Sequence, residues 1–326
     1  MKICLLDNTP LKYNALDIYS NAIRGAENIL INLSLEFAKL NHEVTVYNHC
    51  DKNLKINNVN WCNLNKVNDN PSYDLAISNN DIRLFDKIHA RKKVAISYSI
   101  QSIEKFIRKK QLYSFLKHRP KIILLSEYHR KNRNYLLRLF GSFKTDCAVD
   151  SIFLESEINQ NIDKNQSIFT SYPDRNLAIL VDIWKDYIFK KDKSKKLLIT
   201  PIKDQLKNFN IFNRNFGDKK ELIDDISNSR FALIPGHKAE LYCISAEEIR
   251  ELCVPIITLG IGCLKERVVH GKTGLIAKNK KQFADFITQL FNDDEMWNSF
   301  RKNLLKLRGS KKWHDIASEF LNKAYE

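Results

Sequence analysis

Two carboxylates stand eight positions apart in the segment IPGHKAELYCISAEEIRELCVPIIT, which runs from Ile234 to Thr258. Glu240 follows the apolar run RFALIP, which is typical of a buried strand, and Glu248 lies in the amphipathic stretch before the next apolar run, VPIIT. Carboxylates accept hydrogen bonds strongly, so the pair could bind hydroxyl groups of a ligand. A structural alternative exists for Glu248 alone, because Ser245 and Glu248 have the spacing of a capping box.

Two further residues could bind phosphate. Gly25 begins a long stretch with apolar residues at helical spacing, and a glycine at a helix start lets backbone N–H groups approach an anion. Arg175 lies in the loop FTSYPDRNL, and a guanidinium can bind two phosphate oxygens at once. Each also has a plain explanation, Gly25 as a helix entrance and Arg175 as a surface residue in a turn.

The elements that must position these residues alternate along the chain. Short apolar strands are predicted at KICLLD, VTVYN, DLAIS, KVAISYS and KIILLS, and then at SIFTS, KLLIT, FALIP and PIIT. Helical stretches separate them, which predicts an α/β fold with two doubly wound domains built on parallel sheets. Ligands of such sheets bind beyond the carboxyl ends of the strands, and both Arg175 and Glu240 follow predicted strands.

The polar segment ESEINQNIDKNQ lacks periodicity and predicts the junction between the domains. We therefore expect an N-terminal domain over residues 1–160, a second domain over residues 161–308 and a final helix within residues 309–326. A chain of 326 residues is long enough for each domain to bury its own core.

Composition restricts the class of protein further. The net charge is +15 and the pI is near 9.3, which favours anionic partners, although a solvated lysine-rich surface explains the charge equally well. The runs FIRKKQLYSFLKHRPK and YHRKNRNYLLRLFGSFK could contact nucleic acid or anionic lipid, or form ordinary helix surface.

Several other chemistries are disfavoured by the pattern. The seven cysteines include no C-x-x-C pair, which argues against a disulfide framework or zinc module and fits a reducing cytosol. The histidines lack metal-ligand spacing, and there is no nucleophile elbow or P-loop. No apolar run approaches the roughly twenty residues of a bilayer span, so we expect a cytoplasmic protein, soluble or peripheral on the inner face of a membrane.

Five segments taken in order resemble the GT-B glycosyltransferases of family 4: RGAENILINLSLEFAKLNHEVTVYN, SYPDRNLAILVDIW, FALIPGHKAELYCISAEEI, CVPIIT and VVHGKTGLI. The resemblance extends to about residue 310 and is strongest from Gly217 to Ala277. It implies two Rossmann-like domains facing a cleft, the N-terminal domain on the acceptor side and the second domain binding the nucleotide sugar, with a final helix that crosses back onto the N-terminal domain. It also implies a retaining hexosyltransferase that needs neither a metal ion nor another cofactor.

The resemblance assigns roles to the residues above. Glu240 would be catalytic, orienting the donor sugar near its anomeric carbon, and Glu248 would hold the ribose. Arg175 and Gly25 would bind the donor diphosphate. The backbone N–H groups that would face the donor are those of Tyr242, Cys243 and Ile244. The expected partners are a UDP- or GDP-sugar donor, a glycan or lipid-linked acceptor and an anionic membrane surface, whereas nucleic acid is disfavoured.

The sequence departs from the family pattern at two points. Arg24 stands where the family has the first of two glycines, and residues 169–171 (FTS) replace a region that often carries an earlier arginine. These departures favour one alternative, a catalytically silent relative that binds a glycan or a protein partner on the same scaffold.

Overall fold

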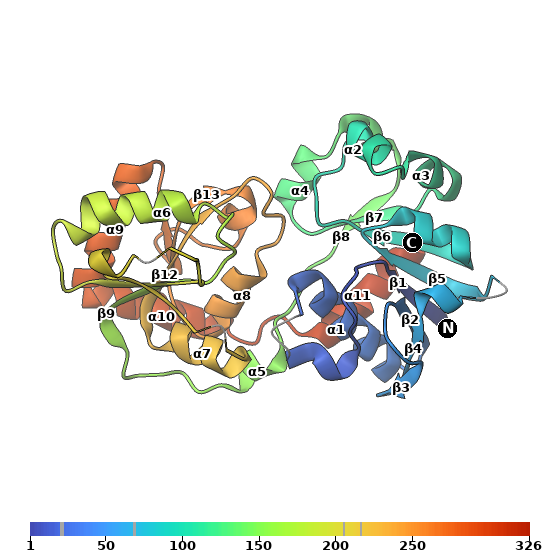
Figure 1. Cartoon of the computed structure of the whole chain (residues 1–326), viewed down its shortest axis with the longest axis horizontal. Coiled ribbons are helices and arrows are strands. Elements are labelled where there is room, and N and C mark those ends of the chain that lie inside the picture. The colour runs from blue at the N-terminus through green and yellow to red at the C-terminus, as the bar shows by residue number, and fades with distance from the viewer. Residues whose placement is uncertain (20–22, 68–69, 205, 216) are drawn as a thin grey trace. The chain divides into compact units, whose positions relative to one another are not determined.

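The computed structural model describes residues 1–19, 23–67, 70–204, 206–215 and 217–326. The chain forms two compact units (Figure 1). The first unit comprises Met1–Cys147 with Lys312–Glu326, and the second unit comprises Ala148–Lys311. Each is a Rossmann-like α/β unit with a predominantly parallel sheet, as the alternation of strands and helices predicted.

The sheet of the first unit has the strand order β3-β4-β2-β1-β5-β6-β7-β8. All neighbouring pairs are parallel except β3 and β4. The chain moves outward from β1 through β2 and β4, then returns to β5 on the other side of β1, so the order reverses between β1 and β5. The strands are β1 (Lys2–Asp7), β2 (Glu43–Asn48), β3 (Leu54–Ile56), β4 (Val59–Asn63), β5 (Ser72–Asn79), β6 (His89–Ile96), β7 (Lys121–Leu124) and β8 (Ser142–Lys144).

The helices of the first unit include one from each end of the chain. Figure 1 shows α11 beside α1, and the rings of Phe37 and Phe320, both fully buried, lie 5.7 Å apart between them. The last helix thus packs within the first unit. The helices are α1 (Gly25–Lys39), α2 (Ile103–Arg108), α3 (Leu112–His118), α4 (Glu127–Asn132) and α11 (Trp313–Tyr325), with 3₁₀ turns at Ala15–Tyr19, Leu64–Lys66, Ile82–Lys87 and Tyr135–Leu139.

The sheet of the second unit is entirely parallel, in the order β11-β10-β9-β12-β13-β14. Here the chain runs outward from β9 to β11 and returns to β12 on the other side of β9. The strand order therefore reverses between β9 and β12. The strands are β9 (Asp163–Phe169), β10 (Lys196–Ile199), β11 (Ile211–Asn213), β12 (Ser229–Gly236), β13 (Ile256–Ile261) and β14 (Gly274–Ile276).

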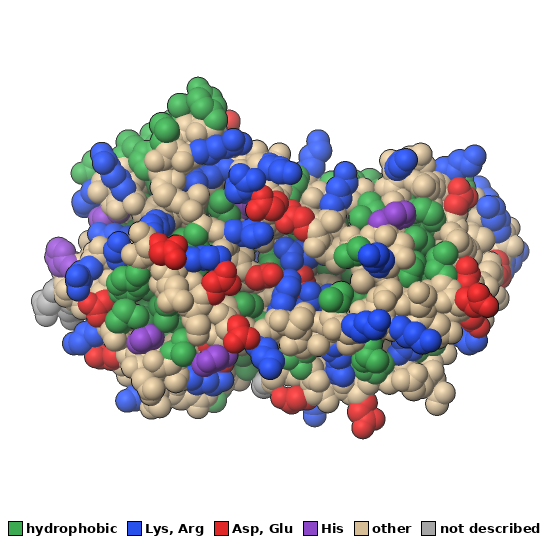
Figure 2. Space-filling view, turned by 180° about the vertical axis from the view of Figure 1, so that it is seen from behind, with side chains coloured by type: hydrophobic (Ala, Val, Ile, Leu, Met, Phe, Trp, Pro, Cys, Tyr) green, Lys and Arg blue, Asp and Glu red, His purple; other side chains and the backbone are tan. Residues whose placement is uncertain are grey.

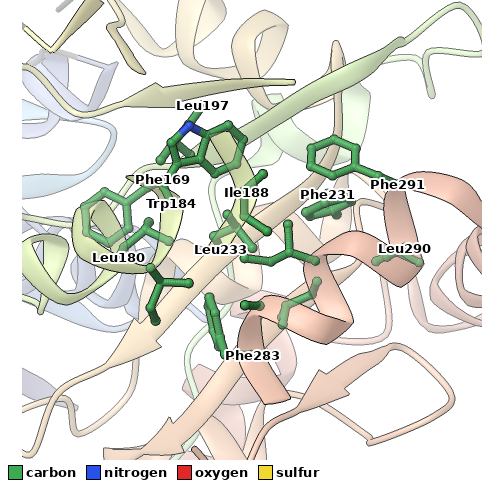
Figure 3. Packing of buried hydrophobic residues seen from close by; sticks show 14 of the residues in the cluster. Phe169, Leu180, Trp184, Ile188, Leu197, Phe231, Leu233, Phe283, Leu290 and Phe291 are labelled. Carbon is green, nitrogen blue, oxygen red and sulfur yellow. The ribbon is translucent and has the colours of Figure 1, made fainter. Parts of the chain in front are cut away.

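Helices cover this second sheet through one large apolar cluster (Figure 3). Trp184 is fully buried, and its indole nitrogen donates to the carbonyl oxygen of Phe209 at 3.0 Å. The helices are α5 (Ser151–Glu155), α6 (Leu177–Ile183) with a π-helical continuation (Trp184–Phe189), α7 (Lys219–Ser227), α8 (Ile244–Glu251), α9 (Lys280–Asn292) and α10 (Asp294–Leu307), with 3₁₀ turns at Lys207–Phe209 and Gly262–Glu266.

The boundary between the units lies after Cys147, earlier than the expected boundary after residue 160. The physical reason is the anchoring of residues 148–156 on the second unit. The Arg308 guanidinium donates to the carbonyl oxygens of Phe153 and Leu154, and α5 packs against α8. The polar stretch that suggested the junction instead leads into β9.

Candidate functional site

The loops that follow β9 and β12 bring together two of the residues singled out from the sequence. Arg175 follows β9 and Glu240 follows β12, and the Arg175 Nε atom lies 3.5 Å from Glu240 Oε2. The strand order reverses between these two strands, and such a reversal point is where open α/β sheets bind ligands beyond the carboxyl ends of their strands. The pair therefore occupies the position that the topology favours for a ligand.

Asn176 fixes the loop that carries Arg175. Its backbone adopts the left-handed conformation, with φ of 67°, which asparagine tolerates better than most residues. Its Nδ2 atom donates to the carbonyl oxygen of Gly236 at 2.5 Å, at the end of β12. This bond ties the loop after β9 to the strand that leads to Glu240.

Glu240 lies in a partly dry environment, with 13% of its side chain exposed. Burial raises the pKa of its carboxyl group, and the Arg175 guanidinium opposes that rise. The backbone beneath it is tightly packed. Gly262 has φ of +73°, and a Cβ atom there would meet the carbonyl oxygens of His237 at 2.4 Å and of Glu240 at 2.8 Å. Gly262 therefore supports the site by packing under Glu240.

Helix α8 begins earlier than the sequence pattern suggested. Its N-cap is Cys243, in the left-handed conformation with φ of 63°, and Ile244 is its first residue. Ser245 is consequently the second residue inside the helix, and Ala246 occupies the position that the glutamate of a capping box would fill. The capping-box interpretation of Glu248 is wrong for this reason.

Glu248 lies on α8 without a partner for its carboxylate among the described residues. Burial and, to a smaller extent, the charge of Asp150 raise its pKa to about 7, although the Lys219 charge opposes the rise. Asp150 and Lys219 themselves form an ion pair. A half-buried carboxylate without a hydrogen-bond donor costs stability, and donors from a ligand's hydroxyl groups would offset that cost.

The neighbouring Glu247 has a structural role, as the buried carboxylate of an ion-pair cluster that the sequence did not predict. It is 2% exposed, and its carboxylate lies 2.6 Å from Arg250, 2.8 Å from Arg267 and 3.0 Å from Lys311. The Tyr242 ring lies against the same cations, 4.1 Å from the Arg267 guanidinium. The Glu247–Arg250 pair at spacing i, i+3 was detectable in the sequence, but the other two contacts are not local.

The remaining predicted residues are placed as follows. Tyr242, Cys243 and Ile244 form the last loop residues and the first residue of α8, where the helix N-terminus carries partial positive charge. The Tyr242 side chain packs on the cations around Glu247, so only its backbone could contact a nucleotide-sugar donor.

Gly25 is the first residue of α1 in the first unit, and Arg24 before it has an extended backbone. Its role in donor binding stays a prediction.

The described ranges have two further features to report, their possible metal-ligand groups and the apolar character of their helices. They contain no group of three or more His, Cys, Asp or Glu side chains that could hold a metal ion. No helix in those ranges has the length and apolar character of a bilayer span. The described chemistry of the second unit is thus a guanidinium, two carboxylates and a helix N-terminus, a set suited to a phosphorylated, hydroxyl-rich ligand.

The comparisons with known proteins agree with this fold. Residues 172–306 match the family model described as glycosyl transferases group 1. The matched segment lies within the second unit. No curated protein sequence is significantly similar to the chain. The architecture is that of the GT-B glycosyltransferase structures, with two Rossmann-like units and parallel sheets.

Three solved structures illustrate the likeness. Anabaena HepE, determined with UDP and glucose, is 13% identical with a TM-score of 0.71, and the match covers 100% of each chain. Sucrose-phosphate synthase from Thermosynechococcus elongatus is 12% identical with a TM-score of 0.70, covering 99% of this chain and 98% of that one. Staphylococcus aureus TarM is 17% identical with a TM-score of 0.60, and this chain covers 55% of its length.

Proposed function

We propose that this protein is a retaining glycosyltransferase that moves a hexose-type sugar from a UDP- or GDP-sugar to a glycan or lipid-linked acceptor without a metal ion. The observation that carries the proposal is the Arg175–Glu240 pair at the strand-order reversal of the second unit. The match of residues 172–306 to the glycosyl transferases group 1 model and the HepE complex with UDP and glucose support it.

In this proposal each group acts on a different part of the donor. Arg175 and the N-terminus of α8 stabilise the negative charge that grows on the departing diphosphate. Glu240 accepts hydrogen bonds from the donor sugar and holds its anomeric carbon towards the acceptor. Glu248 accepts hydrogen bonds from the ribose. None of these steps needs a metal ion, since the guanidinium supplies the positive charge.

A ligand screen tests the proposal. A donor present at about one hundred times its Kd adds about 2.7 kcal/mol to the free energy of unfolding, so the melting temperature rises by several degrees. We expect this rise with UDP-sugars or with GDP-sugars, and the responding set identifies the nucleotide. No rise with any member of either set would contradict the proposal.

The residues around Arg175 and Arg24 favour a second candidate, a silent relative that binds a glycan or a partner. The end of β9 and the loop after it hold Phe169, Thr170 and Ser171, where the resembling family often has another arginine. A donor that binds but releases no sugar, with every acceptor offered, would favour this second candidate over catalysis.

Donor affinity is expected to depend on pH through Glu248. The ribose hydroxyls donate to the ionised carboxylate. Burial and the Asp150 charge raise the pKa of this group to about 7, although the Lys219 charge opposes the rise. The affinity should therefore rise with pH and be about tenfold higher at pH 8 than at pH 6. Calorimetric titration with the intact nucleotide sugar measures this, and Glu248→Gln should abolish the dependence. An unchanged dependence in that variant would contradict the assignment.

The membrane contact rests on a basic–apolar surface formed by α2, α3 and the turn at Tyr135–Leu139. Residues 103–140 hold eleven lysines and arginines against two glutamates. Figure 2 shows hydrophobic side chains beside Lys and Arg side chains over the first unit. Large apolar side chains of this surface are at least 40% exposed: Ile107, Tyr113, Leu116, Tyr135, Leu136 and Leu139. Exposed apolar groups among cations suit an anionic lipid headgroup region.

Vesicle sedimentation tests this contact. We expect binding to vesicles containing phosphatidylglycerol, weakening with salt, and little binding to phosphatidylcholine alone. Leu139→Ser, at a side chain that is 84% exposed, should weaken the binding, whereas Leu54→Ser on β3, 46% exposed, should not. Equal binding to both kinds of vesicle would contradict the role of the cations.

A further inference from the structure

A hollow lies wholly within the first unit, beyond the carboxyl ends of β1 and β5. Its volume is about 440 Å³, within the usual range for small-ligand sites. Asp7 ends β1 and Asn79 ends β5, and both line it, as does Lys109 after α2. The strand order of this unit reverses between β1 and β5, so the hollow occupies the topologically favoured ligand position of its own sheet.

The acids that line the hollow are already engaged by the protein. Asp7 accepts hydrogen bonds from the hydroxyl of Tyr13 at 2.6 Å and from that of Thr9 at 2.9 Å. Asp81 is held by Arg83 through two bonds, at 2.9 Å from Nε and 2.7 Å from Nη2. The Arg83 and Asp81 charges thereby compensate each other, and both carboxylates already accept hydrogen bonds from the protein.

Buried amides, in contrast, lack partners. A smaller hollow of about 20 Å³ adjoins the first, sharing Asn80, Lys109 and Gln111 as lining residues. Gln101 lines it and is 4% exposed, and neither its Nε2 nor its Oε1 atom has a hydrogen-bond partner among the described residues. The Oδ1 atom of Asn79, 3% exposed, is likewise unpartnered there. Such groups cost stability unless a ligand's donors and acceptors satisfy them.

Two ammonium groups also lack acidic partners in the described ranges: that of Lys105, which lines the smaller hollow, and that of Lys109, which lines both hollows. Lys105 reaches only the carbonyl oxygen of Ile100, at 3.4 Å, and no ion pair involves Lys109. Burial lowers the pKa of Lys105, and the charges of Lys109 and Arg108 lower it further. An anionic group placed between the two lysines would relieve this repulsion.

We propose that the larger hollow, together with the smaller hollow that adjoins it, binds a sugar that bears a phosphate or carboxylate group. We further propose that this anionic saccharide is part of the acceptor. Asn79 at the end of β5 and Gln101 before α2 supply amide groups for sugar hydroxyls, and α2 with its following turn supplies lysines for the anion. The acceptor role rests on the proposed function, whereas the binding of the anionic sugar rests on the first unit alone.

Titration calorimetry on the full chain tests the inference with glucose 6-phosphate, glucuronate, glucose and inorganic phosphate. We expect glucose 6-phosphate or glucuronate to bind more tightly than glucose and than phosphate alone, and the tighter of the two identifies the anionic group. Lys109→Gln should weaken that binding about tenfold or more. The matched control Lys110→Gln, which removes an exposed charge outside both hollows, should leave it unchanged.

A second variant separates binding from folding. Gln101→Met removes two unpartnered buried atoms, so it should raise the melting temperature while weakening the anionic sugar about tenfold. The inference is overturned if neither anionic sugar binds, if phosphate alone binds as tightly, if Lys110→Gln weakens binding as much as Lys109→Gln, or if Gln101→Met leaves the affinity unchanged.

The same samples keep this inference distinct from the proposed function. Nucleotide-sugar binding without binding of either anionic sugar would overturn only the inference about the first unit. Binding of an anionic sugar by a protein that binds no UDP- or GDP-sugar would overturn the proposed function and leave the hollow as a saccharide site.

Discussion

Replacing Glu240 by glutamine is expected to lower the rate of sugar transfer by about 10²–10³-fold while the protein stays folded. Glutamine keeps the size of the side chain but removes the negative charge that accepts hydrogen bonds from the donor sugar. The fold should tolerate this change, because burial already raises the pKa of the Glu240 carboxyl group and so disfavours its charge. Release of the nucleotide diphosphate from the donor measures the rate.

The separation of kcat from KM makes this test specific. A group that orients the reacting sugar contributes most in the transition state, so kcat should fall more than KM rises. Asp174→Asn is the matched control, since Asp174 contacts the same Arg175 guanidinium from the solvent side at 3.2 Å and is 70% exposed. Full activity in Glu240→Gln, or an equal loss in Asp174→Asn, would remove Glu240 from the reaction.

Replacing Glu247 by glutamine should destabilise the protein by about 3–5 kcal/mol. The change places a neutral amide where Arg250, Arg267 and Lys311 contact a buried carboxylate, so the desolvation cost of this cluster is offset less well. The melting temperature should fall by about 10 °C. Thermal unfolding followed by circular dichroism at pH 8 measures the effect.

The adjacent residue supplies the control for this prediction. Glu248→Gln should not destabilise the protein at pH 8, because the raised pKa means that ionisation of Glu248 opposes folding. For the wild type that penalty is absent below about pH 4.5 and grows as the pH rises through about 7, where the folded carboxyl group ionises. The same variant should lose donor affinity. Equal destabilisation by the two substitutions would contradict the distinction between them.

The strand ends and their residues were predictable from the sequence for a physical reason. Apolar runs mark parallel strands, and parallel strands place their carboxyl ends at one edge of a sheet. The run RFALIP became β12 and the run SIFTS closed β9, so the loops carrying Glu240 and Arg175 had to meet. The 3.5 Å distance between the two side chains also depends on the loops themselves, since Asn176 beside Arg175 donates to the carbonyl oxygen of Gly236.

The start of α8 was not predictable, and it changed the interpretation of two glutamates. Cys243 adopts a left-handed conformation that glycine or asparagine usually occupies, so nothing in its type indicated an N-cap. Where a helix begins decides which caps can form. Glu247 is buried by cations that come from distant segments, and local spacing cannot reveal such contacts.

The shortest strands and the domain boundary were also not predictable from the sequence. The strands β3, β8, β11 and β14 have three residues each, too few for an apolar period to be recognised. The boundary after Cys147 depends on Arg308, which binds the backbone of residues 153–156 from the far end of the second unit. A polar stretch in one place could not indicate that tertiary contact.

We propose that the second unit binds a nucleotide diphosphate sugar through Arg175, Glu240 and Glu248. A crystal structure with the UDP- or GDP-sugar that gives the largest thermal shift tests it most directly. We expect the diphosphate within hydrogen-bond distance of the Arg175 guanidinium, the sugar at Glu240 and the ribose hydroxyls at Glu248. A nucleotide sugar bound away from the ends of β9 and β12, with these three side chains uncontacted, would contradict it.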